Sequence, residues 1–189
     1  MLKHLLGKKS KVMGYRDPPD PVSEFPQLDE FWQTTEVSNG RFFINGLFQR
    51  KFRLNAPEFG HHWVSFYKAE DGSCWPVGYI HAREYGPMIL IGGVMTDGSA
   101  MSRMKEKHRQ SILDAGGCYY TALRHVFVTM AHQCEAYMGL ISNPRSMKVS
   151  CAAGFERTRD EKLVAYFHKP ISSQRREELI QAALEIGPF

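Results

Sequence analysis

Three side chains near the ends of predicted strands could take a proton from a reacting amine. They are the carboxylates of Asp97 and Glu84 and the imidazole of His81. A carboxylate or an imidazole acts as a general base when it can reach the proton that it removes. Each of the three also fits a structural role, as a turn acid or as a histidine on a strand surface. They are therefore candidate bases, whose role depends on where the fold places them.

A group of basic side chains follows Asp97 in the chain. It consists of Arg103, Lys105, Lys107 and Arg109. Apolar positions three to four residues apart favour a helix over 102–115, which would leave few free backbone N–H groups for an anion. The lysine and arginine side chains could still bind a phosphate as charged groups. We therefore expect these four side chains to contact a phosphate.

The histidines and cysteines form no recognisable metal-binding pattern. His61 and His62 could meet His81 across a hairpin, but a metal site would need a carboxylate or a further histidine in register. None of the four cysteines belongs to a C-x-x-C pair; they are Cys74, Cys118, Cys134 and Cys151. The sequence thus predicts no metal centre, and cysteines that stay reduced, as in a cytoplasmic protein.

The stretch from Ala136 to Lys169 predicts a strand, a short helix and a second strand. An apolar run ends at Ser142, and Asn143 and Pro144 suit the N-cap and the first position of a helix. Gly154 suits the left-handed residue just beyond a helix end. The segment 163–168 then alternates like a strand, after a polar turn.

This stretch resembles the GNAT (Gcn5-related N-acetyltransferase) superfamily. The C-terminal half of that family often has an apolar strand, Asn-x-x-Ala, a Tyr, Gly-Phe and a hairpin. Asn143, Ser146, Gly154 and Phe155 stand at the matching spacing. Ser150 occupies the position where the family usually has its Tyr. With the strands upstream, the resemblance extends over residues 63–169.

Three strands are predicted upstream of this stretch, over 63–69, 75–83 and 88–96. The last is almost wholly apolar, as expected of a central strand covered on both faces. Gly92 and Gly93 inside it indicate a bulge or a close approach of another backbone. Such a meander leading into a bulged central strand resembles the GNAT arrangement, in which the pantetheine arm of coenzyme A lies beside that strand.

The resemblance implies an α/β (α+β) fold with a GNAT-like mixed sheet, a central strand, flanking helices and an extra C-terminal helix. It also implies acetyl-CoA as cofactor. The implied contacts are the basic segment above and Val94, Met95, Thr96, Gly116, Gly117 and Asn143. The chain departs from the family at the phosphate loop, since Gly116-Gly117 has no Arg or Gln in register. Ser150, a poorer proton donor than Tyr, could position a water.

The segments outside this core complete the predicted organisation. Residues 1–24 form a Pro-rich extended arm, 25–170 the GNAT-like domain, and 171–189 a helix that packs on the domain or on a partner. A short helix is expected over 28–36, and Asn45-Gly46 predicts a hairpin over 42–48, with a helix as the second choice.

Composition sets broad bounds on the class of protein. The 189 residues are 43% hydrophobic and 23% charged, which is ordinary for one soluble domain. The net charge of +4 allows an anionic ligand and does not demand nucleic acid. There is neither a signal peptide nor an apolar run of the roughly 20 residues that span a bilayer.

Two functions follow from these features. The first is an atypical acyl-CoA-dependent N-acyltransferase acting on a small-molecule or protein amine. The second is a catalytically silent GNAT-like structural protein of a virion. Thr158-Arg159-Asp160 resembles a turn in a GNAT-like internal virion protein of short-tailed phages. An enzyme should have an open cleft beside the central strand, whereas a scaffold should fill that cleft and bind partner chains through its arm or C-terminal helix. Nucleic-acid binding through Arg50, Lys51, Arg53 and the basic segment 103–109 is a third hypothesis.

Overall fold

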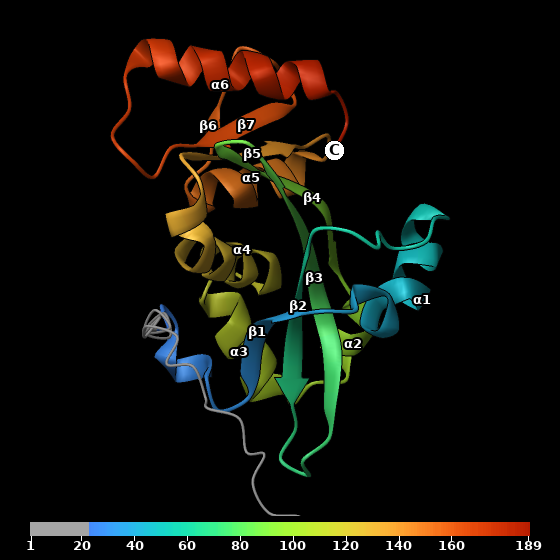
Figure 1. Cartoon of the computed structure of the whole chain (residues 1–189). Helices are drawn as coiled ribbons and strands as arrows, with labels where there is room; N and C mark the ends of the chain where they lie inside the picture. The colour runs from blue at the N-terminus through green and yellow to red at the C-terminus, as the bar shows by residue number, and fades with distance from the viewer. Residues whose placement is uncertain (1–22) are drawn as a thin grey trace, which may run out of the picture.

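A computed structural model describes residues 23–189, which form a mixed sheet flanked by helices (Figure 1). The strand order within this part of the chain is β1-β2-β3-β4-β5-β7-β6. Neighbouring strands are antiparallel except β4 and β5, which are parallel. The strands are β1 (Trp32–Val37), β2 (His61–Lys68), β3 (Cys74–Tyr85), β4 (Met88–Thr96), β5 (Ala136–Leu140), β6 (Glu156–Arg157) and β7 (Leu163–Tyr166).

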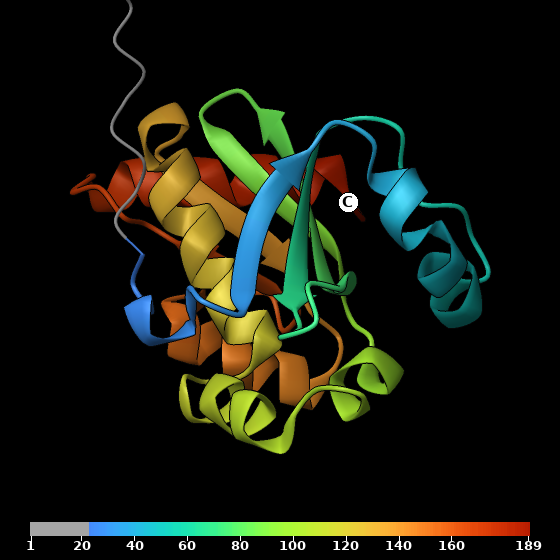
Figure 2. The same cartoon turned by 90° about the horizontal axis from the view of Figure 1, so that it is seen from below.

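Helices cover both faces of this sheet (Figure 2). One face packs on α4 and α5, and the opposite face packs on α1 at one end and α6 at the other. The helices are α1 (Gly40–Phe52), α2 (Gly98–Ser102), α3 (Glu106–Asp114), α4 (Cys118–Met130), α5 (Pro144–Ala153) and α6 (Ser173–Ile186), with 3₁₀ turns at Pro26–Leu28 and Ala131–Gln133. The architecture confirms the predicted mixed α/β class with its additional C-terminal helix.

The central strand β4 contains the bulge that its two glycines predicted. His81 of β3 pairs with Gly92, but Tyr79 pairs with Met95, so β4 holds one extra residue between these pairs. Gly93 takes a left-handed φ of 58°, which glycine adopts at little steric cost. Gly92 also meets another backbone closely, because a Cβ there would lie 2.9 Å from the carbonyl oxygen of Phe189.

The parallel pair β4–β5 separates just after the bulge begins. Its ladder runs from Met88 opposite Ala136 to Ile91 opposite Gly139 and ends there. From Gly92 onward, β4 therefore has no strand partner on its β5 side in the described part of the chain. Backbone polar groups without a ladder partner are available to a ligand or to water.

The order of strand, short helix and strand predicted over residues 136–169 is confirmed. The side chain of Asn143 caps α5, since its Oδ1 accepts from the N–H groups of Arg145 at 2.8 Å and Ser146 at 3.2 Å. Gly154 ends α5 with a φ of 123°. Phe155 then turns into the core between α4 and the sheet.

The helix predicted over 28–36 is wrong. That segment holds a 3₁₀ turn followed by β1, whose register with β2 runs from Trp32–Tyr67 to Val37–His62. The apolar residues that suggested a helix face, Leu28, Phe31 and Trp32, are all buried against the sheet. Pairing with β2 and the β-branched residues of 34–37 outweigh the helical spacing.

The hairpin predicted at Asn45-Gly46 is also wrong, and the second choice, a helix, is observed. Asn39 caps α1 by accepting from the N–H of Phe42 at 3.1 Å. Ile44 and Phe48, one turn apart, are both buried on the sheet. Those two anchors and the cap hold Asn45-Gly46 inside the helix.

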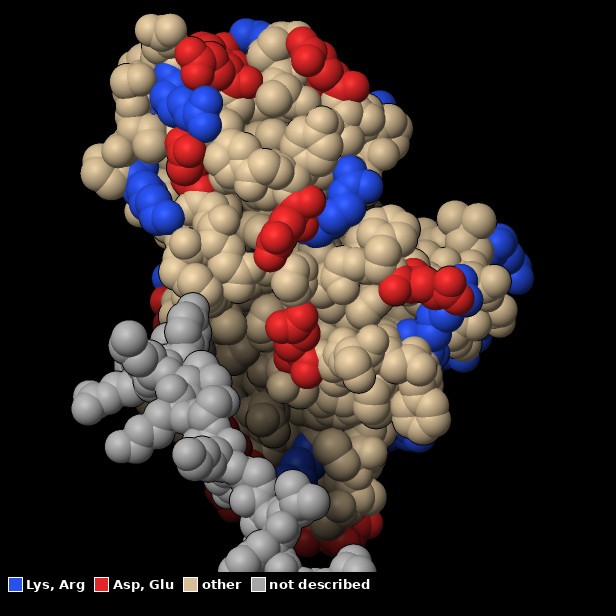
Figure 3. Space-filling view, in the orientation of Figure 1, with Lys and Arg blue, Asp and Glu red and all other residues tan. Residues whose placement is uncertain are grey.

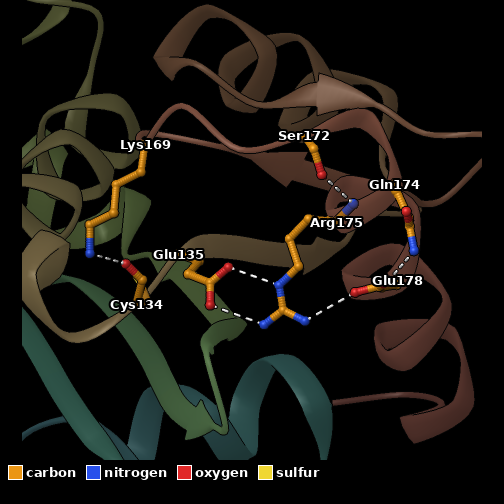
Figure 4. Close-up of polar contacts among 7 residues, drawn as sticks. All are labelled: Cys134, Glu135, Lys169, Ser172, Gln174, Arg175 and Glu178. Atoms are coloured by element: carbon orange, nitrogen blue, oxygen red, sulfur yellow. Dashed lines mark hydrogen bonds and ion pairs between the residues drawn. The ribbon is translucent and has the colours of Figure 1, made fainter.

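The C-terminal helix α6 packs on the start of β5 (Figure 4). Ser172 caps it. Arg175 makes a bidentate ion pair with Glu135, in which its Nε and Nη2 donate to the two carboxylate oxygens at 2.9 and 3.0 Å. Lys169 donates to the carbonyl of Cys134 at 2.6 Å. The buried face of α6, formed by Leu179, Ile180 and Ala183, lies on the sheet. Residues 188–189 thereby reach the separated part of β4.

The N-terminal arm lies almost wholly outside the described residues, which begin at 23. Glu24 at its end forms an ion pair with Arg124 of α4. None of the helices within 23–189 has the length and hydropathy that crossing a bilayer requires.

Candidate active site

A cavity of about 990 Å³ opens where β4 and β5 separate. Its floor is formed by Leu90–Val94 of β4 and by residues 139–143 at the end of β5. One wall comes from α1 and the loop that follows it, and the other from Pro188 and Phe189 after α6. Figure 3 shows the molecular surface indented between the part that carries α6 and the part that carries α1.

A pair of hydroxyl groups lies at this cavity. Tyr119, in the first turn of α4, lines it, and its hydroxyl is 2.8 Å from that of Ser150 on α5. Ser150 is completely buried. Burial raises the pKa of Tyr119 above its ordinary value, so this hydroxyl keeps its proton at neutral pH. The family spacing in the sequence predicts a role for Ser150 but not for Tyr119, although Tyr119 is only two residues beyond Gly117 and is the second residue of α4.

One of the three candidate bases, His81, lines the cavity. It lies opposite Gly92 in the sheet, and its Nε2 donates to the carbonyl of Phe59 at 2.7 Å. That bond leaves the lone pair on Nδ1. Desolvation by burial lowers the pKa of His81, so the ring is neutral and able to accept a proton near pH 7.

The other two candidate bases lie outside the cavity lining. Asp97 caps α2 through its Oδ1, which accepts from Ser99 at 2.9 Å and Ala100 at 3.2 Å, and its Oδ2 faces Arg50 at 3.4 Å. Glu84 is exposed on β3 and lies 3.3 Å from His61. Their positions correspond to the structural roles of a helix-capping acid and a surface acid.

The residues expected to contact the cofactor divide into two groups. Val94, on β4, and Asn143, just after β5, both line the cavity. Met95 is instead buried beneath α1, and Thr96 pairs with Gly78 of β3. Because Met95 and Thr96 follow the bulge on a strand that is still paired with β3, they do not face the opening.

The basic segment is not at the cavity. Lys105 and Lys107 form ion pairs with Glu70 in the β2–β3 turn, and Arg109 pairs with Glu106 one turn away. Arg103 lies over the ring of Trp75, 5.4 Å from its centroid. These side chains therefore lie away from the cavity, because α2 and α3 carry them to the far end of β2 and β3.

The glycine turn before α4 has the features of an anion-binding helix start. Gly117 is the N-cap with a φ of 90°, and a Cβ on Gly116 would meet the ring of Tyr120 at 2.5 Å. The first helical bond runs from Thr121 to the carbonyl of Gly117 at 3.0 Å. The N–H groups of residues 118–120, in the first turn of α4, therefore have no helical acceptor, whereas those of Gly116 and Gly117 donate to Leu113 and Ile112. Neither glycine lines the cavity, but Tyr119 in that turn does.

Three basic side chains face the cavity instead of the predicted segment. Arg41 forms an ion pair with Glu58, which also lines the cavity. Among the described residues, Lys51 and Arg83 have no carboxylate within ion-pair distance. The cavity thus carries a net positive charge.

The histidines on β2 and β3 are held by separate partners. His61 contacts Glu36, His62 bonds to the hydroxyl of Tyr79 at 2.7 Å, and His81 bonds to Phe59. Within residues 23–189, no three His, Cys, Asp or Glu side chains gather in a metal-binding arrangement.

No model of a protein family matches the sequence, and no curated protein matches it. Among solved structures, the chain is similar to ribosomal-protein-S18-alanine N-acetyltransferase from Escherichia coli, with 9% identity and a TM-score of 0.44 over 75% of this chain and 97% of that one. It is similar to an acyl-CoA N-acyltransferase from Pseudomonas aeruginosa, with 13% identity and a TM-score of 0.41 over 71% and 95%. AtaTR, solved with AcCoA bound, has 12% identity and a TM-score of 0.39 over 80% and 99%.

Identities and TM-scores at this level assign no function to the chain. The chain has a GNAT-like fold, as its own topology shows: an antiparallel meander leads into a bulged central strand, and that strand separates from a parallel neighbour. The strand, short helix and hairpin that follow agree with the resemblance that the sequence predicted.

Proposed function

We propose that the protein is an atypical acyl-CoA-dependent N-acyltransferase that uses the cavity between β4 and β5. The observation that carries this proposal is the open space at the strand separation, with the protonated hydroxyl of Tyr119 beside it. A catalytically silent scaffold would be expected to fill that space with side chains. The open cavity therefore favours the enzyme over the structural alternative.

The residues around the cavity fit acetyl-CoA in chemical type. Ile91, Val94 and Phe155 offer apolar contact to a pantetheine arm. The unpaired edge of β4 from Gly92 onward supplies backbone groups for its amides. The first turn of α4 is the proposed pyrophosphate contact, because its free N–H groups and the helix dipole both favour an anion. Gly116 and Gly117 form the turn that precedes it, and their own N–H groups donate to Leu113 and Ile112.

The side chains at the cavity supply the proton transfers that such a reaction needs. Acetyl-CoA would provide a thioester whose carbonyl carbon forms a C–N bond with the amine while its C–S bond breaks. Nδ1 of His81 accepts the proton that the amine nitrogen loses. The hydroxyl of Tyr119 donates a proton to the departing sulfur, and Ser150 orients that hydroxyl. A backbone N–H on the bulged part of β4 polarises the carbonyl oxygen.

Thermal unfolding with excess acetyl-CoA tests this proposal. A ligand at about a hundred times its dissociation constant stabilises the folded protein by about 2.7 kcal/mol. That corresponds to roughly 2–4 °C in melting temperature per kcal/mol. We expect a saturable increase for the wild type and none for Ser146→Trp, which places an indole in the cavity lining.

The matched control is Ser102→Trp on the exposed surface of α2, which should keep the full increase. An equal shift in all three proteins would mean that acetyl-CoA binds elsewhere. The absence of a shift in the wild type would contradict the proposed function.

A further inference from the structure

The mouth of the cavity carries a surface in which apolar and basic side chains alternate. We call Lys51, Phe52, Leu54, Phe59 and Arg83 the rim surface. All five line the cavity. Leu54 is 64% exposed and Phe59 is 57% exposed, which is high for large apolar side chains. Five of the eight exposed large apolar residues in the described chain lie between residues 42 and 59, so this exposure is concentrated in one region.

Neither cation of the rim surface has a paired carboxylate within residues 23–189. Lys51 lies over the ring of Phe52 at 5.4 Å, and Arg83 lies over the ring of Phe59 at 5.9 Å. Glu58, the acidic side chain of the adjoining loop, is already paired with Arg41. A carboxylate placed between these cations would gain electrostatic attraction, and an apolar group beside it would cover the exposed rings.

The loop that presents Leu54 and Phe59 is held by polar contacts at several points. Arg41 donates to the carbonyl of Ala56 at 2.7 Å, and the N–H of Ala56 donates to Asn45 at 2.9 Å. His81 binds the carbonyl of Phe59 at 2.7 Å. The backbone of the loop is therefore held in the conformation that exposes these apolar side chains, which lowers the entropic cost of binding a partner there.

We propose that the acyl acceptor is a polypeptide whose acidic and apolar side chains bind the rim surface while its amine enters the cavity. The inference rests on the proposed function and specifies its substrate class. A small amine enclosed in the cavity would leave the rim surface uncovered. Single-stranded nucleic acid is bound by aromatic side chains together with a positively charged groove that follows the backbone. It fits less well here, because only two cations, Lys51 and Arg83, belong to the rim surface.

Two short synthetic peptides test the inference. Both have a free N-terminal amine; one alternates glutamate with leucine, and the other carries lysine in place of glutamate. Acetylation by mass spectrometry gives kcat and KM for the wild type and for the double charge reversal Lys51→Glu with Arg83→Glu. Lys105→Glu, outside the cavity, is the matched control. Fluorescence anisotropy of both labelled peptides and a single-stranded RNA measures binding without turnover.

We expect the wild type to prefer the acidic peptide. The double reversal should raise the KM for the acidic peptide by about tenfold or more with little change in kcat, and should lower the KM for the basic peptide. The Lys105→Glu control should keep the wild-type KM and kcat. Equal use of both peptides, or tighter binding of the RNA, would overturn the inference. If the double reversal instead weakens the binding of acetyl-CoA, the two cations would contact the cofactor, and the inference would also be overturned. In each of these cases acetyl-CoA would still raise the melting temperature of the wild type, so only the inference about the acceptor would fail. If acetyl-CoA does not raise that melting temperature, the proposed function itself fails.

Discussion

The hydroxyl of Tyr119 on α4 lies 2.8 Å from the hydroxyl of Ser150 on α5. The two helices pack side by side on one face of the sheet, so the pair joins them at the point where β4 and β5 separate. Ser150 stands at the position where the GNAT pattern has its Tyr, and the proposed function takes the phenol from Tyr119 on another helix instead.

Removing this phenol should slow acyl transfer without weakening cofactor binding. Tyr119→Phe is expected to lower kcat by about a hundredfold or more, because general acid catalysis contributes about 10²–10⁴-fold. The affinity for acetyl-CoA, measured by calorimetry, should stay within about twofold, since the ring is retained. Ser150→Ala should give a smaller loss of kcat, because it removes only the partner that orients the hydroxyl.

Tyr120→Phe is the matched control for Tyr119→Phe. Tyr120 is the next residue of α4 but does not line the cavity. Its variant should keep the kcat of the wild type. Equal activity in both variants would exclude Tyr119 as the proton donor.

The proposed base, His81, should determine the acid limb of the pH–rate profile. Desolvation lowers its pKa below the ordinary value of 6.5, so the rate should fall with decreasing pH below that value as the ring gains a proton. His81→Gln can still donate to Phe59 but cannot act as a base. It should be slower by about a hundredfold and should lose this limb. A profile that is unchanged in the variant would assign the limb to another group.

The bulge glycine should be needed for both stability and cofactor binding. Gly93→Ala forces a side chain into a left-handed backbone, which costs about 1–2 kcal/mol, and its Cβ would lie 3.3 Å from that of His81. Gly72→Ala, in the β2–β3 turn with a φ of 82° and no atom within 4 Å of the new Cβ, is the matched control. Both variants should unfold more easily in denaturant, but only Gly93→Ala should lose affinity for acetyl-CoA. Equal affinity in the two would separate the bulge from the site.

Folding stability should fall as the solution becomes mildly acidic. Burial lowers the pKa of His62, His81 and His125 below the ordinary 6.5, so the unfolded chain binds protons at a higher pH than the folded protein does. The stability that these neutral rings provide is complete above pH 6.5 and is lost as the pH falls through the lowered values. Denaturant midpoints should be constant from about pH 7.5 to 6.5 and should decrease as the pH falls further to about 5.5. A midpoint that stays constant below pH 6.5 would show that these rings are not desolvated.

The parts of the fold that the sequence predicted well are those with local physical signals. β4 combines an apolar run with two glycines, and α5 has Asn143 and Gly154 at its ends, so cap chemistry and burial agree. The errors at 28–36 and 42–48 occurred where tertiary pairing decides. β1 exists because β2 pairs with it, and α1 exists because Ile44 and Phe48 pack on the sheet.

The site was harder to predict because its members converge from distant segments. Asn143 and Val94 follow from the family spacing and line the cavity. Tyr119 could not be distinguished from a core aromatic without knowing that α5 places Ser150 against it. The loop 53–60 carries no family motif, and its part in the cavity depends on contacts with α1 and His81. The basic side chains of 103–109 predicted a phosphate contact in that segment. In the structure, Glu70 and Glu106 neutralise part of its positive charge.

A crystal structure of the protein with coenzyme A would test the central claim most directly. The account predicts the pantetheine arm between β4 and β5, with the sulfur within about 4 Å of the hydroxyl of Tyr119 and the pyrophosphate at the first turn of α4. Coenzyme A bound instead along Arg103, Lys105 and Arg109, with the cavity beside Tyr119 left empty, would contradict it.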